Sequence, residues 1–208
     1  MKILFYGDSI TDAGRNREKT EANVGLGNGY VFCATTALLN KDLEKYEIYN
    51  RGISGNRVVD LYARIKCDCW NLEPDVISIL IGVNDVWHEI AQENGVEIDR
   101  FENVYRIMLS ETVKRLPNAK IIICEPFVLP GTATEEKYDR FLAVKEYAKV
   151  VKRLAEEFNL YFVELQKPYD EAAKRYGNTK LLRDGVHPTT EGAAVLANEW
   201  MKVFEKIN

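Results

Sequence analysis

Short apolar runs alternate along the chain with longer segments in which apolar residues recur every three or four positions. The short runs are rich in β-branched and aromatic residues and predict five strands, at residues 2–6, 47–50, 76–81, 120–124 and 161–164. The longer segments predict helices at residues 30–39, 58–70, 100–115, 138–158 and 190–207. This alternation, with strands that are apolar almost throughout, is typical of a parallel sheet covered by helices on both faces.

No repeat, low-complexity tract or linker interrupts the alternation, so we expect residues 1–208 to form a single three-layer α/β domain. Open parallel sheets place their sites beyond the carboxyl ends of the strands. The segments after the first three predicted strands, residues 7–29, 52–56 and 82–99, are therefore expected to be the loops that carry the site. A shorter loop, residues 125–134, follows the fourth strand.

Composition excludes several classes of protein. Hydrophobic residues make up 46% of the chain and charged residues 29%, with a formal net charge of −4, so nothing favours binding to nucleic acid or to an anionic membrane. The apolar run at residues 3–6 is too short for a signal peptide and no later run spans a membrane, which predicts a cytoplasmic protein. Four cysteines beside only two histidines do not favour a zinc site, so we expect free thiols and neither metal nor other cofactor.

Four serines are candidates for chemistry. Ser78 lies within a predicted strand and Ser110 within a predicted helix, so both are expected to be structural, whereas Ser54 lies in a glycine turn. Ser9 follows the first strand directly, and the glycine two residues before it permits a sharp turn that exposes the hydroxyl. An ordinary helix cap uses the same residues, so Ser9 alone does not identify a site.

A serine hydroxyl becomes a good nucleophile only when a base takes its proton. The chain offers His88 and His187, and His187 follows Asp184 by three residues, just before the last predicted helix. A turn there lets the carboxylate accept the Nδ1 proton and leaves Nε2 free as the base. The alternative is an ordinary loop in which Thr189 or Thr190 caps the helix. His88 is more typical of a pocket wall than of a base.

The negative charge that develops on an attacked carbonyl needs hydrogen-bond donors. Two turns after predicted strand ends supply candidates: Gly52-Ile53-Ser54-Gly55-Asn56 and Gly82-Val83-Asn84-Asp85. Glycine N–H groups and asparagine amides suit this purpose, although such turns are also common without any function. The glycine-rich residues 25–29 lack the Lys-Ser/Thr ending of a P-loop, so we interpret them as a flexible active-site loop.

Taken in order, four of these segments resemble the signature blocks of the SGNH (GDSL) hydrolases and together reach from residue 7 to residue 188. The blocks are Gly7-Asp8-Ser9-Ile10, Gly55 within Ile53-Ser54-Gly55-Asn56, Gly82-Val83-Asn84-Asp85, and Asp184-Gly185-Val186-His187-Pro188. The Gly-x-Ser-x-Gly elbow of ordinary α/β-hydrolases is absent. The resemblance implies a three-layer, flavodoxin-like fold with a five-stranded parallel sheet.

The same resemblance implies roles for five residues. Ser9 is the expected nucleophile, with Asp184 and His187 as the acid–base pair. The expected oxyanion donors are the N–H groups of Ser9 and Gly55 and the side-chain amide of Asn84.

Longer segments, at residues 7–15, 50–56 and 81–87, are similar to intracellular acetylxylan esterases of this superfamily. This narrower resemblance implies an acetylated oligosaccharide as the substrate and a homo-oligomer. His88 departs from the pattern, because an arginine or a similar residue is expected there, so the substrate preference stays open. Trp87, Tyr30 and His88 are the candidate substrate-binding residues, and packing in the core is the alternative for Trp87 and Tyr30.

Two alternatives remain at this point. A lysophospholipase or thioesterase of the same superfamily would need an apolar groove for a long acyl chain, whereas polar and aromatic residues near the predicted site favour a sugar. A catalytically inactive glycan-binding module on the same fold is the other alternative, and the presence of all five site residues argues against it.

Overall fold

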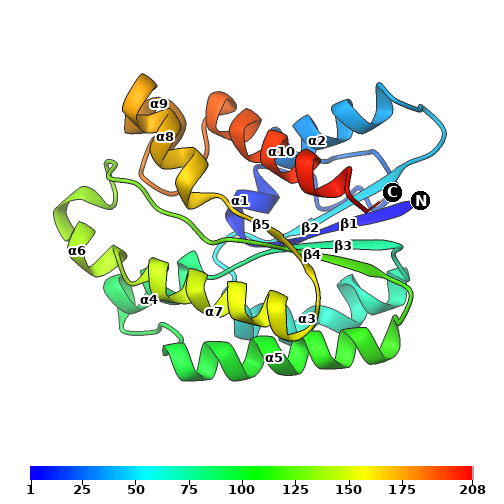
Figure 1. Ribbon diagram of the computed structural model, residues 1–208, viewed down its shortest axis with the longest axis horizontal. Helices are drawn as coiled ribbons and strands as arrows, with labels where there is room; N and C mark the ends of the chain where they lie inside the picture. The colour runs from blue at the N-terminus through cyan, green and yellow to red at the C-terminus, as the bar shows by residue number, and fades with distance from the viewer. Residues whose placement is uncertain (208) are drawn as a thin grey trace.

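The computed structural model describes residues 1–207 and is built on one parallel sheet (Figure 1). The strands lie in the order β2-β1-β3-β4-β5, and every pair is parallel. Their bounds are β1 Lys2–Gly7, β2 Glu47–Gly52, β3 Val76–Leu80, β4 Lys120–Cys124 and β5 Tyr161–Val163. The predicted five-stranded parallel sheet is confirmed. The strand order reverses direction between β1 and β3, and in open α/β sheets the crevice at such a switch holds the ligand.

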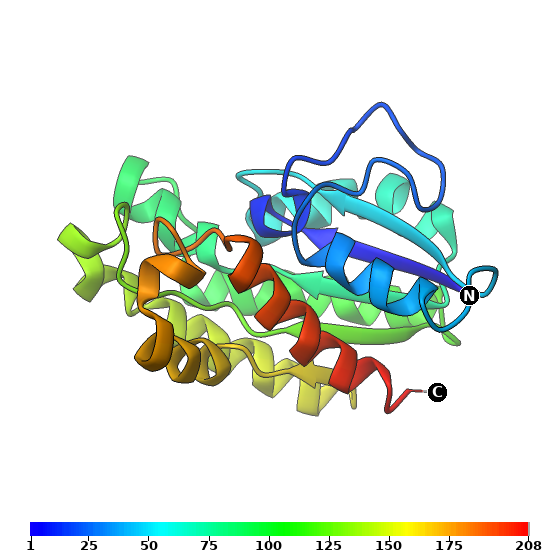
Figure 2. The same ribbon diagram turned by 90° about the horizontal axis from the view of Figure 1, so that it is seen from above.

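Helices cover both faces of this sheet (Figure 1). One layer contains α2 Tyr30–Leu39, α8 Gln166–Tyr176, α9 Asn178–Leu181 and α10 Thr190–Phe204; the other contains α3 Val58–Asp68, α5 Ile98–Arg115 and α7 Val144–Glu157. Figure 2 shows α2 and α10 side by side across the first layer. The short helices α1 Ser9–Asp12, α4 Val83–Gln92 and α6 Tyr138–Phe141 lie at the carboxyl ends of the strands.

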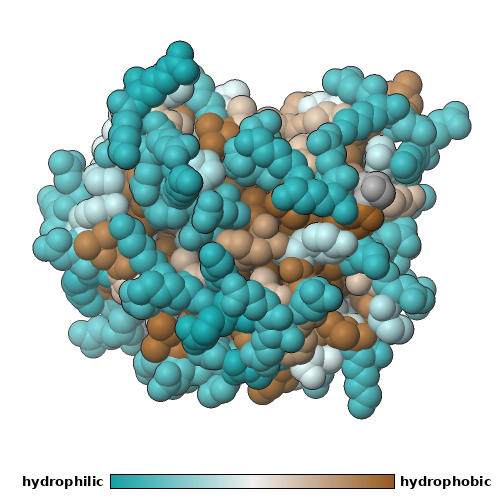
Figure 3. Space-filling view, viewed as in Figure 1, coloured by the Kyte–Doolittle hydropathy of each residue, from teal (hydrophilic) through white to brown (hydrophobic). Residues whose placement is uncertain are grey.

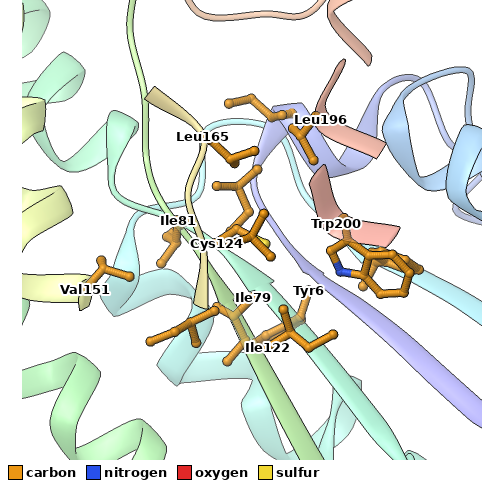
Figure 4. Close-up of a cluster of buried hydrophobic side chains, with 14 of the residues drawn as sticks. Tyr6, Ile79, Ile81, Ile122, Cys124, Val151, Leu165, Leu196 and Trp200 are labelled. Carbon is orange, nitrogen blue, oxygen red and sulfur yellow. The ribbon is translucent and has the colours of Figure 1, made fainter. Parts of the chain in front are cut away.

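The core lies on both faces of the sheet because neighbouring residues of each strand point in opposite directions. On β1, Phe5 packs against Trp200 of α10, with ring centroids 4.8 Å apart, while Tyr6 on the other face donates its hydroxyl hydrogen bond to Leu61 O of α3. All five residues of β3 are buried. Its hydroxyl-bearing member, Ser78, accepts a hydrogen bond of 2.9 Å from the Trp200 indole, so this serine is structural, as expected. Figure 4 shows part of this core, with Ile79 of β3 and Trp200 of α10 among its labelled side chains.

The surface is mainly polar, and Figure 3 shows hydrophilic residues over most of one face with hydrophobic ones between them. Within residues 1–207, no helix combines the length and the apolar character that crossing a bilayer requires.

One predicted loop is wrong. Residues 82–99 were expected to be a loop, but they contain the ten-residue helix α4. Val83 and Val86 are buried, and Trp87 and Ile90 pack against the core. This apolar face at helical spacing outweighs the turn-like Asn-Asp pair at the start of the segment.

Other differences concern the ends and continuity of helices and strands. The predicted helix at residues 138–158 is divided into α6 and α7, and the one at 58–70 ends at Asp68, with a 3₁₀ turn at Trp70–Leu72. A second 3₁₀ turn covers Glu135–Lys137, and α10 ends at Phe204. The helices α1, α8 and α9 were not predicted; α8 has Tyr169 as its one fully buried residue, so its apolar pattern is weak.

Candidate active site

Ser9 lies at the first position of α1, immediately beyond the carboxyl end of β1. The preceding Asp8 caps this helix, because its Oδ1 accepts a hydrogen bond of 2.9 Å from Ile10 N. Gly7 is required by close packing, since a Cβ there would overlap the Thr11 side chain and the Leu80 carbonyl of β3. The capping role left open for Ser9 therefore falls to Asp8, and the Ser9 hydroxyl is available for chemistry.

Asp184 and His187 share the loop before α10, and the carboxylate of Asp184 shapes that loop. Its Oδ1 accepts from the backbone N–H groups of Val186 and His187, at 3.0 and 2.8 Å. Gly185, which follows Asp184 directly, has φ 96°, a conformation that glycine adopts without strain. The cap of α10 is a different residue, Thr189, whose hydroxyl accepts from the N–H of the residue three positions later.

These two side chains and Ser9 form one chain of hydrogen bonds. Asp184 Oδ2 lies 2.6 Å from His187 Nδ1, and His187 Nε2 lies 2.8 Å from Ser9 Oγ. An acid that orients an imidazole, which in turn contacts a hydroxyl, is the arrangement that activates a serine. The structure thus brings together three residues from the two ends of the sequence.

The electrostatics suit this arrangement. Partial burial disfavours the charged form of Asp184, but the hydrogen bonds from the His187 ring and from two backbone N–H groups outweigh it and hold the pKa of Asp184 well below its usual range. The hydrogen bond to Asp184 raises the pKa of His187, although partial burial of the ring opposes this. An ionised Asp184 favours the tautomer with a proton on Nδ1, which leaves Nε2 able to accept from Ser9.

Candidate oxyanion donors surround the same hydroxyl. Gly55 and Asn84 line a hollow together with Ser9 and His187. The Asn84 side-chain nitrogen donates to Asn56 O at 3.1 Å, which holds the amide in place. Among residues 1–207, neither the N–H of Ser9 nor that of Gly55 donates to a protein acceptor. Both N–H groups are therefore free to donate to a substrate oxygen.

Comparison with known proteins identifies the family. The model of the GDSL-like Lipase/Acylhydrolase family matches residues 5–195. The chain belongs to this family. Over 97% of its length it is 37% identical to an acetylxylan esterase from Geobacillus stearothermophilus, of which the match covers 92%. A 26% identity over 98% of the chain and 86% of the relative relates it to an isoamyl acetate-hydrolyzing esterase from Saccharomyces cerevisiae.

Solved structures agree on the fold. The crystal structure of a putative GDSL-like lipase from Parabacteroides merdae matches with a TM-score of 0.92 and 42% identity, covering 98% of this chain and 95% of that one. The protein is thus a GDSL-type carboxylic ester hydrolase, and the inactive glycan-binding module is set aside.

Two of the three candidate substrate-binding residues of this GDSL-family esterase lie in the site. Trp87 and His88, on α4, line the hollow that contains Gly55 and Asn84. The Trp87 ring centroid lies 5.9 Å from that of His187. Burial lowers the pKa of His88, and the nearby Arg57 lowers it further, so His88 is neutral near pH 7.

Tyr30, the third candidate, is placed differently from Trp87 and His88. Its side chain is 1% exposed and its ring packs edge-on against Phe5, with centroids 5.6 Å apart. Its hydroxyl lies 3.1 Å from Thr11 Oγ1. Although Tyr30 borders a hollow at the site, its ring belongs to the core, because the first turn of α2 packs directly on β1.

A second hollow of the esterase, of about 400 Å³, also contains Ser9 and His187 and has a polar wall. The residues that sequence reasoning had not assigned there include Arg183, Thr190 and Glu191. Arg183 directly precedes Asp184 in the same loop, and this adjacency indicates from the sequence that Arg183 lies near the site. Asn28 also lines this hollow, so the glycine-rich residues 25–29 do reach the site. The four cysteines are free, and no group of three or more His, Cys, Asp or Glu within residues 1–207 is arranged to hold a metal.

Proposed function

We propose that the protein is a serine esterase that removes small acyl groups, above all acetyl, from a carbohydrate through an acyl-enzyme on Ser9. The observation that carries this proposal is the hydrogen-bond chain from Asp184 through His187 to Ser9, with distances of 2.6 and 2.8 Å. Each distance lies within the reach that proton transfer requires. The family membership supports ester hydrolysis independently of this geometry.

The reaction proceeds in two halves. Ser9 Oγ attacks the ester carbonyl while its proton passes to His187 Nε2, and the imidazolium is stabilised by the ionised Asp184. The negative oxygen of the tetrahedral intermediate accepts from the N–H groups of Ser9 and Gly55 and from the Asn84 amide. When the intermediate collapses, the C–O bond to the sugar breaks and His187 returns the proton to the departing alcohol. Water then attacks the acyl-serine by the same route and releases the acid.

The two hollows beside Ser9 support a small acyl group on a polar alcohol. The hollow with the polar wall offers the guanidinium of Arg183, the hydroxyl of Thr190 and the carboxylate of Glu191, and such donors and acceptors match the hydroxyls of a sugar. The other hollow has Trp87 and Ala91 on its wall. An apolar wall of this kind suits an acyl group or the face of a sugar ring. The two curated relatives are both named for acetyl esters, which favours acetyl.

The test is hydrolysis of acetylated xylo-oligosaccharides, together with aryl esters from acetyl to octanoyl. We expect kcat/KM to fall beyond two or three carbons. Each methylene buried in an apolar groove would instead contribute about 0.8 kcal/mol, so a rate that climbs with chain length would support the lysophospholipase or thioesterase alternative.

The nucleophile is tested by substitution and labelling. Ser9→Ala should fold normally and lose hydrolysis by several orders of magnitude, because Ser9 supplies the attacking oxygen. Ser110→Ala, at an exposed helical position, is the matched control and should retain full activity. A serine-directed phosphonate should label Ser9 alone. Full activity of Ser9→Ala, or labelling of Ser54, would refute the mechanism.

A further inference from the structure

Asp12 is a buried carboxylate that joins the helix of Ser9 to the turn of Gly55. It is the last residue of α1, and 4% of its surface is exposed. Its Oδ2 accepts two hydrogen bonds from Ser54, from N at 3.1 Å and from Oγ at 3.2 Å. Arg17 forms an ion pair with the same oxygen. The carboxylate therefore holds Ser54, the residue immediately before Gly55, through two hydrogen bonds.

The rest of this turn is held at its two ends. At the start, Ile53 N donates to Gly7 O at 3.0 Å. At the end, Asn56 accepts from Arg64 Nε at 2.7 Å through its side chain and from the Asn84 amide through its carbonyl. Between these anchors, in the part of the chain that the structure describes, Asp12 alone hydrogen-bonds Ser54.

Packing does not replace this contact. Ser54 is exposed, and a Cβ on Gly55 would meet open space. Gly55 has φ 83°, in a region that glycine enters and leaves freely. The turn is closed by Asn56 N, which donates to Ile53 O at 3.2 Å, but this bond does not fix the orientation of the central Ser54–Gly55 peptide. If Ser54 is not held, a flip of that peptide turns the Gly55 N–H away from the site. Burial disfavours the ionised form of Asp12, but Arg17 and the Ser54 N–H hold its pKa below the usual range, so the carboxylate stays an acceptor.

We propose that Asp12 is a positioning residue for the oxyanion hole, which by holding Ser54 through two hydrogen bonds keeps the Gly55 N–H aimed at the oxygen of the ester attacked by Ser9. This inference rests on the proposed function, because the role of Gly55 is part of it. Asp12 touches no substrate atom. It links α1, the helix that carries Ser9, to the turn after β2, and these two elements must keep a constant distance as charge develops.

The experiment compares an aryl acetate with the O-aryl thionoacetate that has the same leaving group. A thiocarbonyl sulfur is a weak hydrogen-bond acceptor on a longer bond, so oxyanion donors stabilise its transition state little. The ratio of kcat/KM for the two esters therefore reports on the oxyanion hole, whereas general damage to the fold lowers both rates alike.

The variants are Asp12→Ala, the milder Asp12→Asn, and Asp75→Ala as a control. Asp75 also accepts from a backbone N–H, that of Lys2 at 2.7 Å, but at the amino ends of β1 and β3, the end of the sheet away from Ser9. Removal of an oxyanion donor costs about 10²–10³ in kcat. For a donor that is misaligned rather than removed, we expect Asp12→Ala to lower kcat on the aryl acetate by at least about tenfold, with KM within about twofold of the original protein.

The ratio of kcat/KM for the aryl acetate to kcat/KM for the thionoacetate should fall by a similar factor in Asp12→Ala. It should fall less in Asp12→Asn and stay unchanged in Asp75→Ala. An unchanged kcat, or a loss of kcat with an unchanged ratio in both Asp12 variants, would overturn the inference. Failure of the proposed function gives a different result, because Ser9→Ala would then retain activity whatever the ratio does in the Asp12 variants.

Discussion

Replacement of Asn84 tests the proposed catalytic role of its side-chain amide beside the structural role that the hydrogen bond to Asn56 shows. A side-chain amide has two N–H donors. One of them is used by Asn56 O at 3.1 Å, so one remains for the substrate oxygen. Asn84 is 6% exposed and follows the first residue of α4, so it is held by the helix as well as by this bond. Asn84→Ala removes both the proposed oxyanion donor and the hydrogen bond to the Gly55 turn.

The two losses have different magnitudes and different assays. Loss of one oxyanion donor costs about 10²–10³ in kcat, or about 2.7–4 kcal/mol in transition-state stabilisation. Loss of the tether to Asn56 lowers the free energy of unfolding by about 1 kcal/mol. Hydrolysis of 4-nitrophenyl acetate should show the first effect in kcat with little change in KM, and urea unfolding followed by circular dichroism should show the second.

Asn84→Asp is the sharper variant, because it keeps the size of the side chain and has no donor. Its carboxylate also places negative charge where the oxyanion forms, so we expect it to be less active than Asn84→Ala. A kcat within about tenfold of the original protein in both variants would refute the assignment of Asn84 as a donor. Higher activity for Asn84→Asp than for Asn84→Ala would refute the electrostatic argument.

Three further predictions concern the base and the two aromatic residues. Because His187 must be neutral to accept a proton, kcat/KM should rise with pH around a midpoint above the usual histidine pKa of about 6.5, since the bond to Asp184 raises the pKa of His187. Asp184→Asn should lower the rate by about 10⁴ and also lower this midpoint. An unshifted midpoint would mean that another group controls the profile. Trp87→Ala should raise KM for an acetylated oligosaccharide by about 3- to 10-fold, as expected for a lost ring contact of about 0.5–1.5 kcal/mol, and should leave KM for a small aryl acetate unchanged. Equal effects on both substrates would mean that Trp87 supports the fold. Tyr30→Phe should lower the free energy of unfolding by about 1 kcal/mol through loss of the hydrogen bond between its hydroxyl and Thr11, and it should leave KM unchanged. A raised KM would mean that Tyr30 contacts the substrate.

The segments predicted correctly are those in which local pattern and burial agree. The strand at residues 120–124 and the helix at residues 30–39 have the expected bounds, because each is a strongly apolar or strongly periodic run between clear breaks. The helix α4 was missed because its first residues, Gly82-Val83-Asn84-Asp85, read as a turn. Only contact with the core shows that Val83 and Val86 occupy one buried face.

The fold class and the family follow from the sequence alone, because the alternation of strands and helices and the four motif blocks are local properties of the chain. The sequence also shows which acid accompanies His187, since Asp184 lies within one turn of it. Tertiary structure alone decided that His187 reaches Ser9, 178 residues away, because the carboxyl end of β1 and the loop before α10 meet only when the sheet and its helices pack. It also decided that Tyr30 and Asp12 are buried, although their residue types fit a surface pocket as well as a buried position. Which neighbours enclose a side chain depends on contacts between distant segments, and no local pattern records them.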